Sequence, residues 1–335
     1  MAQQTIMTID SGTTNTRVVL WDLNQQMICM QKKEVGVRDT AINGSNQLLK
    51  RGVKECIDGV LEQASIGFDD VKTIIASGMI TSNMGLVEIP HVVAPAGMDE
   101  LAAATKAVLL EDVCPKPIWF IPGIKNNSQP VDMQNYEAMD IMRGEETESV
   151  YLIERYHEGK PMVLILPGSH TKLVAVNEQG KITGCMTSIS GELLSALSFH
   201  TIIADAVGRR FVDEEYSKEM TLYGYQNCKK VGISRASFSA RILSQFSGKS
   251  ANSIANYMLG VSLQEDVAAM KNTDALRLDA DSTILIAGKN PLRQALVDVL
   301  EYDGYYKNII NYSPEEGKPM SALGASLIAG KCNLL

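Results

Sequence analysis

The fold is decided by residues 6–22, IMTIDSGTTNTRVVLWD. An apolar run carries one carboxylate, Asp10, into a group of small and hydroxyl-bearing residues, and a second apolar run follows. This order predicts two antiparallel strands joined by a turn that contains Gly12, Thr13 and Thr14. N–H groups and hydroxyls in such a turn can hold phosphate oxygens, and a neighbouring carboxylate can hold Mg²⁺. The segment therefore indicates phosphate chemistry with Asp10 as metal ligand, although an Asx turn would also explain the aspartate.

A similar order returns in residues 163–176, VLILPGSHTKLVAV. Gly168 and Ser169 offer N–H and hydroxyl donors, and Lys172 adds a positive charge just beyond the turn. His170 lies in the same turn, where it is either a surface residue or a contact to phosphate or substrate. Two such hairpins, one in each half of the chain, predict a nucleotide clamped between two domains.

The length of 335 residues fits two domains, because single hydrophobic cores stop growing near ~250–300 residues. We expect the first domain over residues 1–150 and the second over residues 151–335. The formal net charge of −8 argues against binding to nucleic acid or an acidic membrane, since both attract basic surfaces. Anionic ligands must then be held by local N–H groups, Mg²⁺ and a few basic side chains.

Cysteine usage and the N-terminus indicate a cytoplasmic protein. The 6 cysteines lie far apart with no Cys-x-x-Cys pair, so we expect reduced thiols rather than disulfides or a zinc site. The first residues lack the basic and apolar regions of a signal peptide, and no apolar run approaches the ~18 residues of a membrane span. A homodimer is compatible with the sequence, which does not set the oligomeric state.

Apolar periodicity divides the rest of the chain into alternating strands and helices, as in sheets covered by helices. In the first half we expect strands at 27–35, 71–76 and 118–121, helices at 45–64, 98–110 and 145–157, and a polar loop at 122–130. In the second half we expect strands at 162–166, 172–176, 182–188, 283–287 and 308–312, and helices at 192–205, 292–300 and 320–327. Residues 214–271 are predicted to be an almost wholly helical insertion with two glycine-containing turns. The last helix is expected to return to the cleft or the first domain.

The densest cluster of charge lies between the two hairpins, at residues 140–146, DIMRGEE. A helix start explains the acids, but it does not call for an arginine and a glycine in the same turn. The functional interpretation is a general base that takes a proton from a substrate hydroxyl, together with an arginine that binds a carboxylate or the transferred phosphate. We prefer Asp140 as the base, with Glu145 close behind, and Arg143 as the arginine.

Other polar turns are candidates for lining the pocket. Ser82 and Asn83 follow a buried strand, and Gly191 and Glu192 open a helix, although ordinary loops and helix caps would also explain them. The strand-to-helix turn at Gly288 suits the close approach of a flat adenine or a ribose. The candidate substrate ligands are thus Ser82, Asn83, His170, Gly191 and Glu192.

These motifs resemble those of known families. The two hairpins and the Ala287-Gly288 turn resemble the superfamily of sugar kinases, heat-shock ATPases and actin. More narrowly, the chain resembles the 2-dehydro-3-deoxygalactonokinase family in motifs that keep the same order over nearly its whole length. They are SGMITSNMG (77–85), IPG (121–123), MRGEET (142–147), LPGSHTK (166–172) and SGEL (190–193). Ser11 and Leu173 stand where that family often has Trp, which bears on the pocket floor.

The resemblance implies an α/β fold of two ribonuclease H-like, actin-like ATPase domains with a nucleotide cleft between them. It also implies transfer of phosphate from ATP, with Mg²⁺, to the C6 hydroxyl of 2-dehydro-3-deoxy-D-galactonate in galactonate catabolism. Alternatives remain open at this point: a kinase of the same fold for another keto-deoxy acid or a hexose, a phosphatase, or a noncatalytic binding protein. Activity on a panel of acids separates them.

Overall fold

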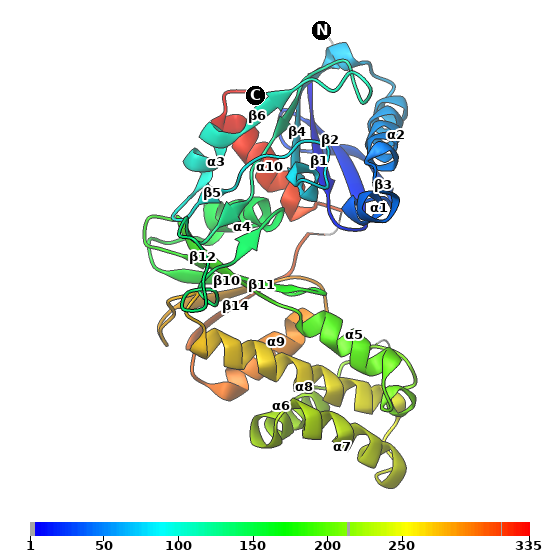
Figure 1. The fold of residues 1–335 in the computed structure, drawn as a ribbon, viewed down its shortest axis with the longest axis vertical. Coiled ribbons are helices and arrows are strands. Elements are labelled where there is room, and N and C mark those ends of the chain that lie inside the picture. The colour runs from blue at the N-terminus through cyan, green and yellow to red at the C-terminus, as the bar shows by residue number, and fades with distance from the viewer. Residues whose placement is uncertain (1–3, 213–214, 316) are drawn as a thin grey trace.

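The structure is a computed structural model that describes residues 4–212, 215–315 and 317–335. Two large sheets, one in each half of the chain, are covered by helices and arranged as two lobes (Figure 1). The first sheet has the order β3-β2-β1-β4-β7-β6. Its strands are β1 (Thr5–Ser11), β2 (Thr16–Asp22), β3 (Met27–Lys33), β4 (Val71–Gly78), β6 (Lys106–Val108) and β7 (Ile118–Phe120).

The second sheet has the order β12-β11-β10-β13-β14. Its strands are β10 (Met162–Leu166), β11 (Thr171–Val176), β12 (Ile182–Ser188), β13 (Thr283–Ala287) and β14 (Asn308–Tyr312). In both sheets the first strand of the half pairs antiparallel with the second and parallel with the fourth. The two predicted hairpins are therefore confirmed, and each occupies the same place in its own sheet.

Helices cover the first sheet as the apolar periodicity predicts. The helix α2 (Gln47–Ala64) packs on β2 and β3 through a buried stripe that includes Leu49, Val53 and Ile57. Burying such a stripe is the main source of stability for a surface helix. The short helix α1 (Val37–Asn43) precedes α2 in the chain and was not predicted from the sequence.

Three segments differ from the sequence-based assignment. The helix α3 (Met98–Ala104) ends well before residue 110, because the following residues form β6 and pair with β7 at the sheet edge. The helix α5 (Ser190–His200) stops before residue 205 and is followed by a 3₁₀ turn, η3 (Ala204–Val207). The predicted loop at 122–130 contains β8 (Ile124–Lys125), which joins β5 (Val92–Val93) and β9 (Ile141–Met142) in a small third sheet.

The helical insertion is confirmed within the described residues. It consists of α6 (Lys218–Val231), α7 (Ile233–Phe246) and α8 (Ala251–Asn272), which pack on one another and on α5 and α9 (Leu292–Asp303). Gly232 and Gly248 make its two turns with φ of 78° and 66°. In Figure 1 the insertion forms the far end of the second lobe.

The last helix, α10 (Met320–Lys331), returns to the first lobe, as expected. It packs on α3, α4 (Glu145–Tyr156), β1 and β4. A Cβ on Gly324 would lie 1.8 Å from the carbonyl oxygen of Thr147, so glycine is required where α10 crosses α4. One buried cluster joins Ile6 of the first sheet to Leu164 of the second through this helix pair. The division into two domains at residue 150 remains a proposal. It assigns residues 320–331 to the second domain, although these residues pack on the first lobe.

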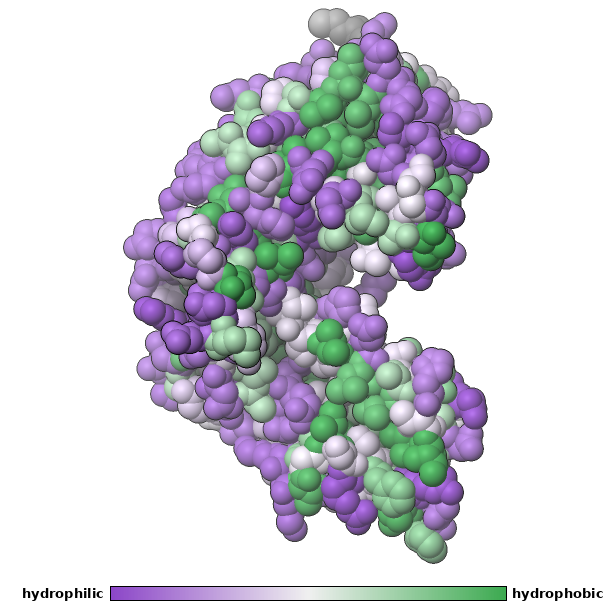
Figure 2. Space-filling view, in the orientation of Figure 1, coloured by the Kyte–Doolittle hydropathy of each residue, from purple (hydrophilic) through white to green (hydrophobic). Residues whose placement is uncertain are grey.

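A hollow separates the two lobes on one side of the molecule (Figure 2). The helices α1 and α5 lie on opposite sides of this gap in Figure 1. All 6 cysteines are free, as the sequence predicts. Within the part of the chain that the structure describes, no helix is long and apolar enough to cross a membrane.

Candidate active site

The turn between β1 and β2, residues 12–15, is held in shape by its own backbone and by the start of α1. Gly12 N donates to Asn15 O at 2.9 Å, and the N–H groups of Val37 and Arg38 donate to Gly12 O at 3.2 Å and Thr13 O at 2.9 Å. Thr13 is exposed at the tip. This first turn therefore lies beside α1 at the hollow between the lobes.

Asp10 lies at the end of β1, next to the first turn. Its Oδ2 accepts a hydrogen bond from Ser321 Oγ at 2.8 Å and lies 4.0 Å from Arg17 Nη1. Burial raises the pKa of Asp10, and the Ser321 hydrogen bond and the Arg17 charge lower it in part. A Cβ on Gly78 would lie 3.2 Å from Asp10 Oδ1, so the end of β4 also borders this carboxylate.

The start of α4 brings further carboxylates to the same place. Gly144, with φ of 112°, packs against Gly78, since a Cβ on Gly144 would lie 3.3 Å from Gly78 Cα. Burial, with the negative charges of Asp10 and Glu145, raises the pKa of Glu148 to about 8, and the positive charge of Arg17 offsets part of this. The charges of Asp10 and Glu145 thus act on Glu148, and we call these three half-buried carboxylates the acidic group.

This acidic group suits a divalent cation bound with a nucleotide. No set of three metal-ligating side chains is present among the described residues. Mg²⁺ usually needs only one or two protein carboxylates, because it keeps waters and binds phosphate oxygens. Partly buried carboxylates with few basic side chains nearby are left with excess negative charge, which a cation would compensate. The residues therefore fit the expected ion, and Asp10 is the carboxylate that would hold it, with Glu145 and Glu148 nearby.

Arg143 is fixed against the loop that follows β4. Its Nη1 donates to Thr81 Oγ1 at 2.6 Å, and its Nη2 donates to Ile89 O at 2.8 Å and lies 3.3 Å from His91 Nδ1. Burial and the neighbouring Arg143 charge lower the pKa of His91 to about 4, so the imidazole stays neutral. The guanidinium is half-buried, and these bonds use only some of its five N–H groups.

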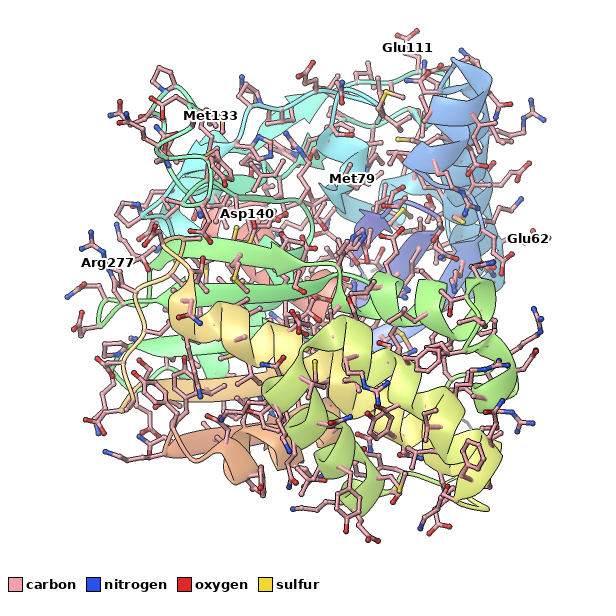
Figure 3. All side chains as sticks on the ribbon, turned by 60° about the horizontal axis from the view of Figure 1, so that its bottom comes forward. Glu62, Met79, Glu111, Met133, Asp140 and Arg277 are labelled. Carbon is pink, nitrogen blue, oxygen red and sulfur yellow. The ribbon has the colours of Figure 1, made fainter. Side chains whose placement is uncertain are left out.

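Asp140 is bound to the second sheet. Its carboxylate accepts from Ile141 N at 2.6 Å, Thr187 N at 2.5 Å and Thr187 Oγ1 at 3.0 Å, and Oδ1 lies 3.7 Å from Lys172 Nζ. Figure 3 shows Asp140 over the strands of the second sheet, below the loop that carries Met133. Most of the lone pairs of Asp140 are therefore already used, which leaves little capacity to accept a substrate proton.

Lys172 is also turned inward. Its side chain is 6% exposed, and its ammonium group donates to Ile141 O at 2.8 Å and to Thr187 Oγ1. The direct phosphate contact expected of Lys172 has no support in this arrangement. Because Lys172 and Thr187 lie on adjacent strands, they fasten residues 140–141 to the second sheet.

The turn between β10 and β11, residues 167–170, is packed tightly on two glycines. A Cβ on Gly191 would lie 2.1 Å from Gly168 O, and a Cβ on Gly288 would lie 2.8 Å from Pro167 Cγ. Glu192 N donates to Ser169 O at 2.8 Å, which joins the turn to the start of α5. This second turn therefore packs on Gly288 and on Gly191 near the start of α5, and α5 lies across the hollow from α1 and the first turn (Figure 1).

The other predicted substrate ligands lie in different surroundings. His170 Nε2 lies 2.9 Å from Glu192 Oε2, and both side chains are exposed at the second turn. Ser82 is buried and its Oγ donates to Met79 O at 2.7 Å, whereas Asn83 is exposed. Ser82 directly follows Thr81, whose hydroxyl binds Arg143, so this loop lies beside the arginine.

Several residues of the site escape the sequence analysis. The strand register pairs Arg17 with Asp10, so counting residues across the predicted hairpin would have pointed to Arg17. Glu148 lies one turn beyond Glu145 on α4, so helical spacing points to it. Thr81 lies within the motif at 77–85, next to the predicted Ser82, whereas His91 and Ser321 come close only through tertiary packing and no local pattern indicates them.

The repeated sheet order and the paired hairpins, one in each lobe, are those of the actin-like ATPase fold. The model of the family described as 2-keto-3-deoxy-galactonokinase matches residues 10–315. The chain belongs to this family, and it is therefore a nucleotide-dependent phosphotransferase.

Solved structures share the fold. A crystal structure described as a "putative 2-dehydro-3-deoxygalactonokinase protein" from Sinorhizobium meliloti aligns with a TM-score of 0.71 and 20% identity, over 97% of this chain and 98% of that one. The activator of 2-hydroxyisocaproyl-CoA dehydratase from Clostridium difficile, with bound ADPNP, aligns with a TM-score of 0.50 and 10% identity, over 99% and 96%. Component A of the (R)-2-hydroxyglutaryl-CoA dehydratase of Acidaminococcus fermentans has a TM-score of 0.50 and 12% identity, over 98% and 99%. No curated protein matches the chain.

Proposed function

We propose that this kinase transfers the γ-phosphoryl group of ATP to the C6 hydroxyl of 2-dehydro-3-deoxy-D-galactonate, a step of galactonate catabolism. One observation carries the proposal: the first turn and the second turn border the same hollow, one beside α1 and the other beside α5. Exposed N–H and hydroxyl donors on two facing lobes can grip a polyphosphate from both sides. Family membership supports the sugar acid as the acceptor.

The nucleotide is proposed to lie across this hollow. Gly12, Thr13 and Thr14 would contact the β- and γ-phosphates from the first lobe. Gly168 and Ser169 would contact them from the second lobe, and Gly288 would leave room for the adenosine. Asp10 would hold Mg²⁺, which supplies positive charge to the phosphate oxygens as negative charge shifts during transfer.

For the base, the contacts favour Glu145 over Asp140. Asp140 already accepts three hydrogen bonds and lies beside Lys172, whereas Glu145 Oε2 accepts one from Arg143 N at 3.1 Å. Glu145 also belongs to the acidic group around Asp10, where the γ-phosphate is proposed to lie. In the reaction Glu145 takes the proton of the acceptor hydroxyl, the hydroxyl oxygen bonds to the γ-phosphorus, and the bond to the β-phosphate oxygen breaks to release ADP.

Arg143 is proposed to bind the carboxylate of the sugar acid. Thr81 and Ile89 hold the guanidinium in one orientation, and its remaining N–H groups fit a planar carboxylate. Ser82 and Asn83 from the same loop, and His170, Gly191 and Glu192 from the second lobe, are proposed to contact sugar hydroxyls. Lys172 is proposed to act indirectly, by holding residues 140–141 on the second sheet.

A coupled assay of ADP release tests the proposal. The purified protein is supplied with ATP, Mg²⁺ and either 2-dehydro-3-deoxygalactonate or its gluconate epimer, and ³¹P and ¹³C NMR locate the new phosphate. We expect turnover with the galactonate and phosphorylation at C6. Preference for the epimer or for a hexose would reassign the substrate, and phosphate release without any acceptor would indicate a phosphatase.

Two broader proposals concern the protein in the cell. We propose that it works in the cytoplasm, where its free cysteines stay reduced. We also propose a homodimer, because α7 exposes Phe238, Ile242 and Phe246 on the outer end of the second lobe. Light scattering after size-exclusion chromatography measures the mass, and a monomer at micromolar concentration would contradict the dimer.

A further inference from the structure

One buried carboxylate lies directly beneath the second turn. Asp266, on α8 of the helical insertion, is only 1% exposed, and its Oδ2 accepts a hydrogen bond from Ser190 Oγ at 2.7 Å. Its Oδ1 has no hydrogen-bond partner among the described residues. A buried carboxylate with one unpaired oxygen is costly, so its presence here needs an explanation.

Hydroxyl groups connect Asp266 to the turn. Ser190 Oγ lies 3.0 Å from Thr171 Oγ1, and both groups are buried. Thr171 is the first residue of β11, immediately after the second turn, and Ser190 is the first residue of α5, next to Gly191. A second residue of α8, Ser262, donates from its Oγ to Ser190 O at 2.7 Å. The insertion is therefore fastened to both segments that shape the second turn.

The geometry around the turn allows little movement of these segments. Gly191 contacts Gly168 so closely that no Cβ fits between them, and Glu192 N donates to Ser169 O at 2.8 Å. A shift of Ser190 would therefore move the N–H groups and hydroxyl that the second turn presents at the hollow. Small displacements of groups that position a reacting phosphate are costly in rate and affinity.

We propose that Asp266 is a positioning residue for the nucleotide: through Ser190 and Thr171 it fixes the second turn in the conformation that binds phosphate. This inference rests on the proposed function, because it assumes that the second turn holds ATP. It also gives the helical insertion a role in catalysis, although α8 lies behind the turn.

The electrostatics agree with a carboxylate retained for position rather than for stability. Burial raises the pKa of Asp266, and the nearby hydroxyl groups of Ser188, Ser190 and Thr171 lower it in part. Those three hydroxyls come from β12, α5 and β11, so the buried carboxylate lies among the ends of three elements and is bonded to one of them directly, through Ser190. An apolar residue of similar size would fill the space without fixing these ends relative to one another.

The first test compares Asp266→Asn with the parent protein in ATP binding and in turnover. The affinity for ATP is measured by calorimetry, and KM is measured for ATP and for the sugar acid. We expect ATP to bind about 10-fold more weakly, the scale of one hydrogen bond to a charged group, while KM for the sugar acid stays within about twofold. A variant that is only less stable would not bind ATP more weakly while its KM for the sugar acid stays unchanged.

Asp298→Asn is the matched control. Asp298 is 5% exposed on α9 of the same lobe and binds Tyr216 and Lys218, with neither turn among its partners in the described residues. It should lower the melting temperature without changing the affinity for ATP. Thr171→Val is the second variant, because it removes the hydroxyl and keeps the branched shape of a strand residue. It should weaken ATP binding in the same direction as Asp266→Asn.

The outcomes separate this inference from the proposed function. Parental affinity for ATP in Thr171→Val, or an equal rise of both KM values in Asp266→Asn, would overturn the positioning role while the kinase assignment stands. A parent protein that binds no ATP would overturn both. A parent that binds ATP but phosphorylates none of the acids would overturn the proposed substrate, and the binding measurements would still decide the role of Asp266.

Discussion

Ser321 Oγ donates a hydrogen bond of 2.8 Å to Asp10 Oδ2, which joins residues 311 positions apart in the chain. Ser321 lies in the first turn of α10, and Asp10 lies at the end of β1. The bond ties the last helix to the proposed metal ligand. The packing of α10 on α4 therefore bears directly on the site.

Asp10→Asn should lower kcat by about 10²-fold or more, because an amide holds a divalent cation and its phosphate oxygens less well than a carboxylate. The rate is measured as ADP release over a range of Mg²⁺ concentrations, and the concentration for half-maximal rate should rise. Asp22→Asn is the control, since Asp22 lies at the opposite end of the same hairpin, where it pairs with Thr5. Equal losses in the two variants would contradict the role of Asp10.

Glu145→Gln should lower kcat by about 10²–10⁴-fold, the usual range for removing a general base, and should leave ATP binding nearly unchanged. Asp140→Asn should keep kcat within about tenfold of the parent. It should lower the melting temperature instead, because an amide nitrogen cannot accept the N–H bonds of Ile141 and Thr187. If Asp140→Asn abolishes turnover in a stable protein and Glu145→Gln does not, Asp140 is the base.

Arg143→Lys should raise KM for the sugar acid by about 10-fold or more, since lysine keeps the charge but loses the planar fork that binds a carboxylate. KM for ATP should change little. Arg51→Lys on the exposed face of α2 is the control. A parallel rise of KM for ATP would indicate that Arg143 binds the transferred phosphate instead.

Gly191→Ala should displace the second turn, because the added Cβ would lie 2.1 Å from Gly168 O. We expect a loss of about 1–3 kcal/mol in the free energy of unfolding and a weaker affinity for ATP. Gly67→Ala is the matched change at a negative φ of −108°, with no atom of the described residues within 4 Å of the added carbon. It should alter stability by less than about 0.5 kcal/mol. Unchanged ATP affinity in Gly191→Ala would exclude the second turn from the nucleotide site.

Glu146→Gln should make stability less dependent on pH. Glu146 is fully buried at the start of α4, its Oε2 accepts from Gly144 N at 2.6 Å, and burial with the charge of Glu145 raises its pKa from 4.5 to about 8. Between these values the folded protein binds more protons than the unfolded chain, so stability is greatest at low pH and falls as pH rises.

Urea unfolding of the parent and of Glu146→Gln at several pH values measures the effect. The neutral amide mimics the protonated acid, so the free energy of unfolding of the variant should fall less steeply with pH than that of the parent. The difference in slope should reach up to about 1.4 kcal/mol per pH unit. It should therefore be the more stable protein near pH 8. Parallel curves for the two proteins would show that Glu146 does not titrate in this range.

Much of the candidate site could be proposed from the sequence because local chemistry sets the strands and turns that carry it. Alternating apolar residues with small turn residues predict both hairpins, and Asp10 follows from its place at a strand end. The choice of base did not follow in this way. Asp140 and Glu145 lie in one charged segment, but Asp140 is bound to Thr187, 47 residues further on, and only the folded chain shows that its oxygens are used.

The sequence by itself determined the two strand-turn-strand units, the covering helices and the family. Strand and turn preferences depend on residues a few positions apart, and motifs keep their order along the chain. Only the tertiary structure decided that Lys172 is buried against Asp140, that Ser321 orients Asp10, and that Asp266 lies beneath the second turn. Each of these contacts depends on how whole helices and sheets pack, and packing brings together side chains that no local pattern relates.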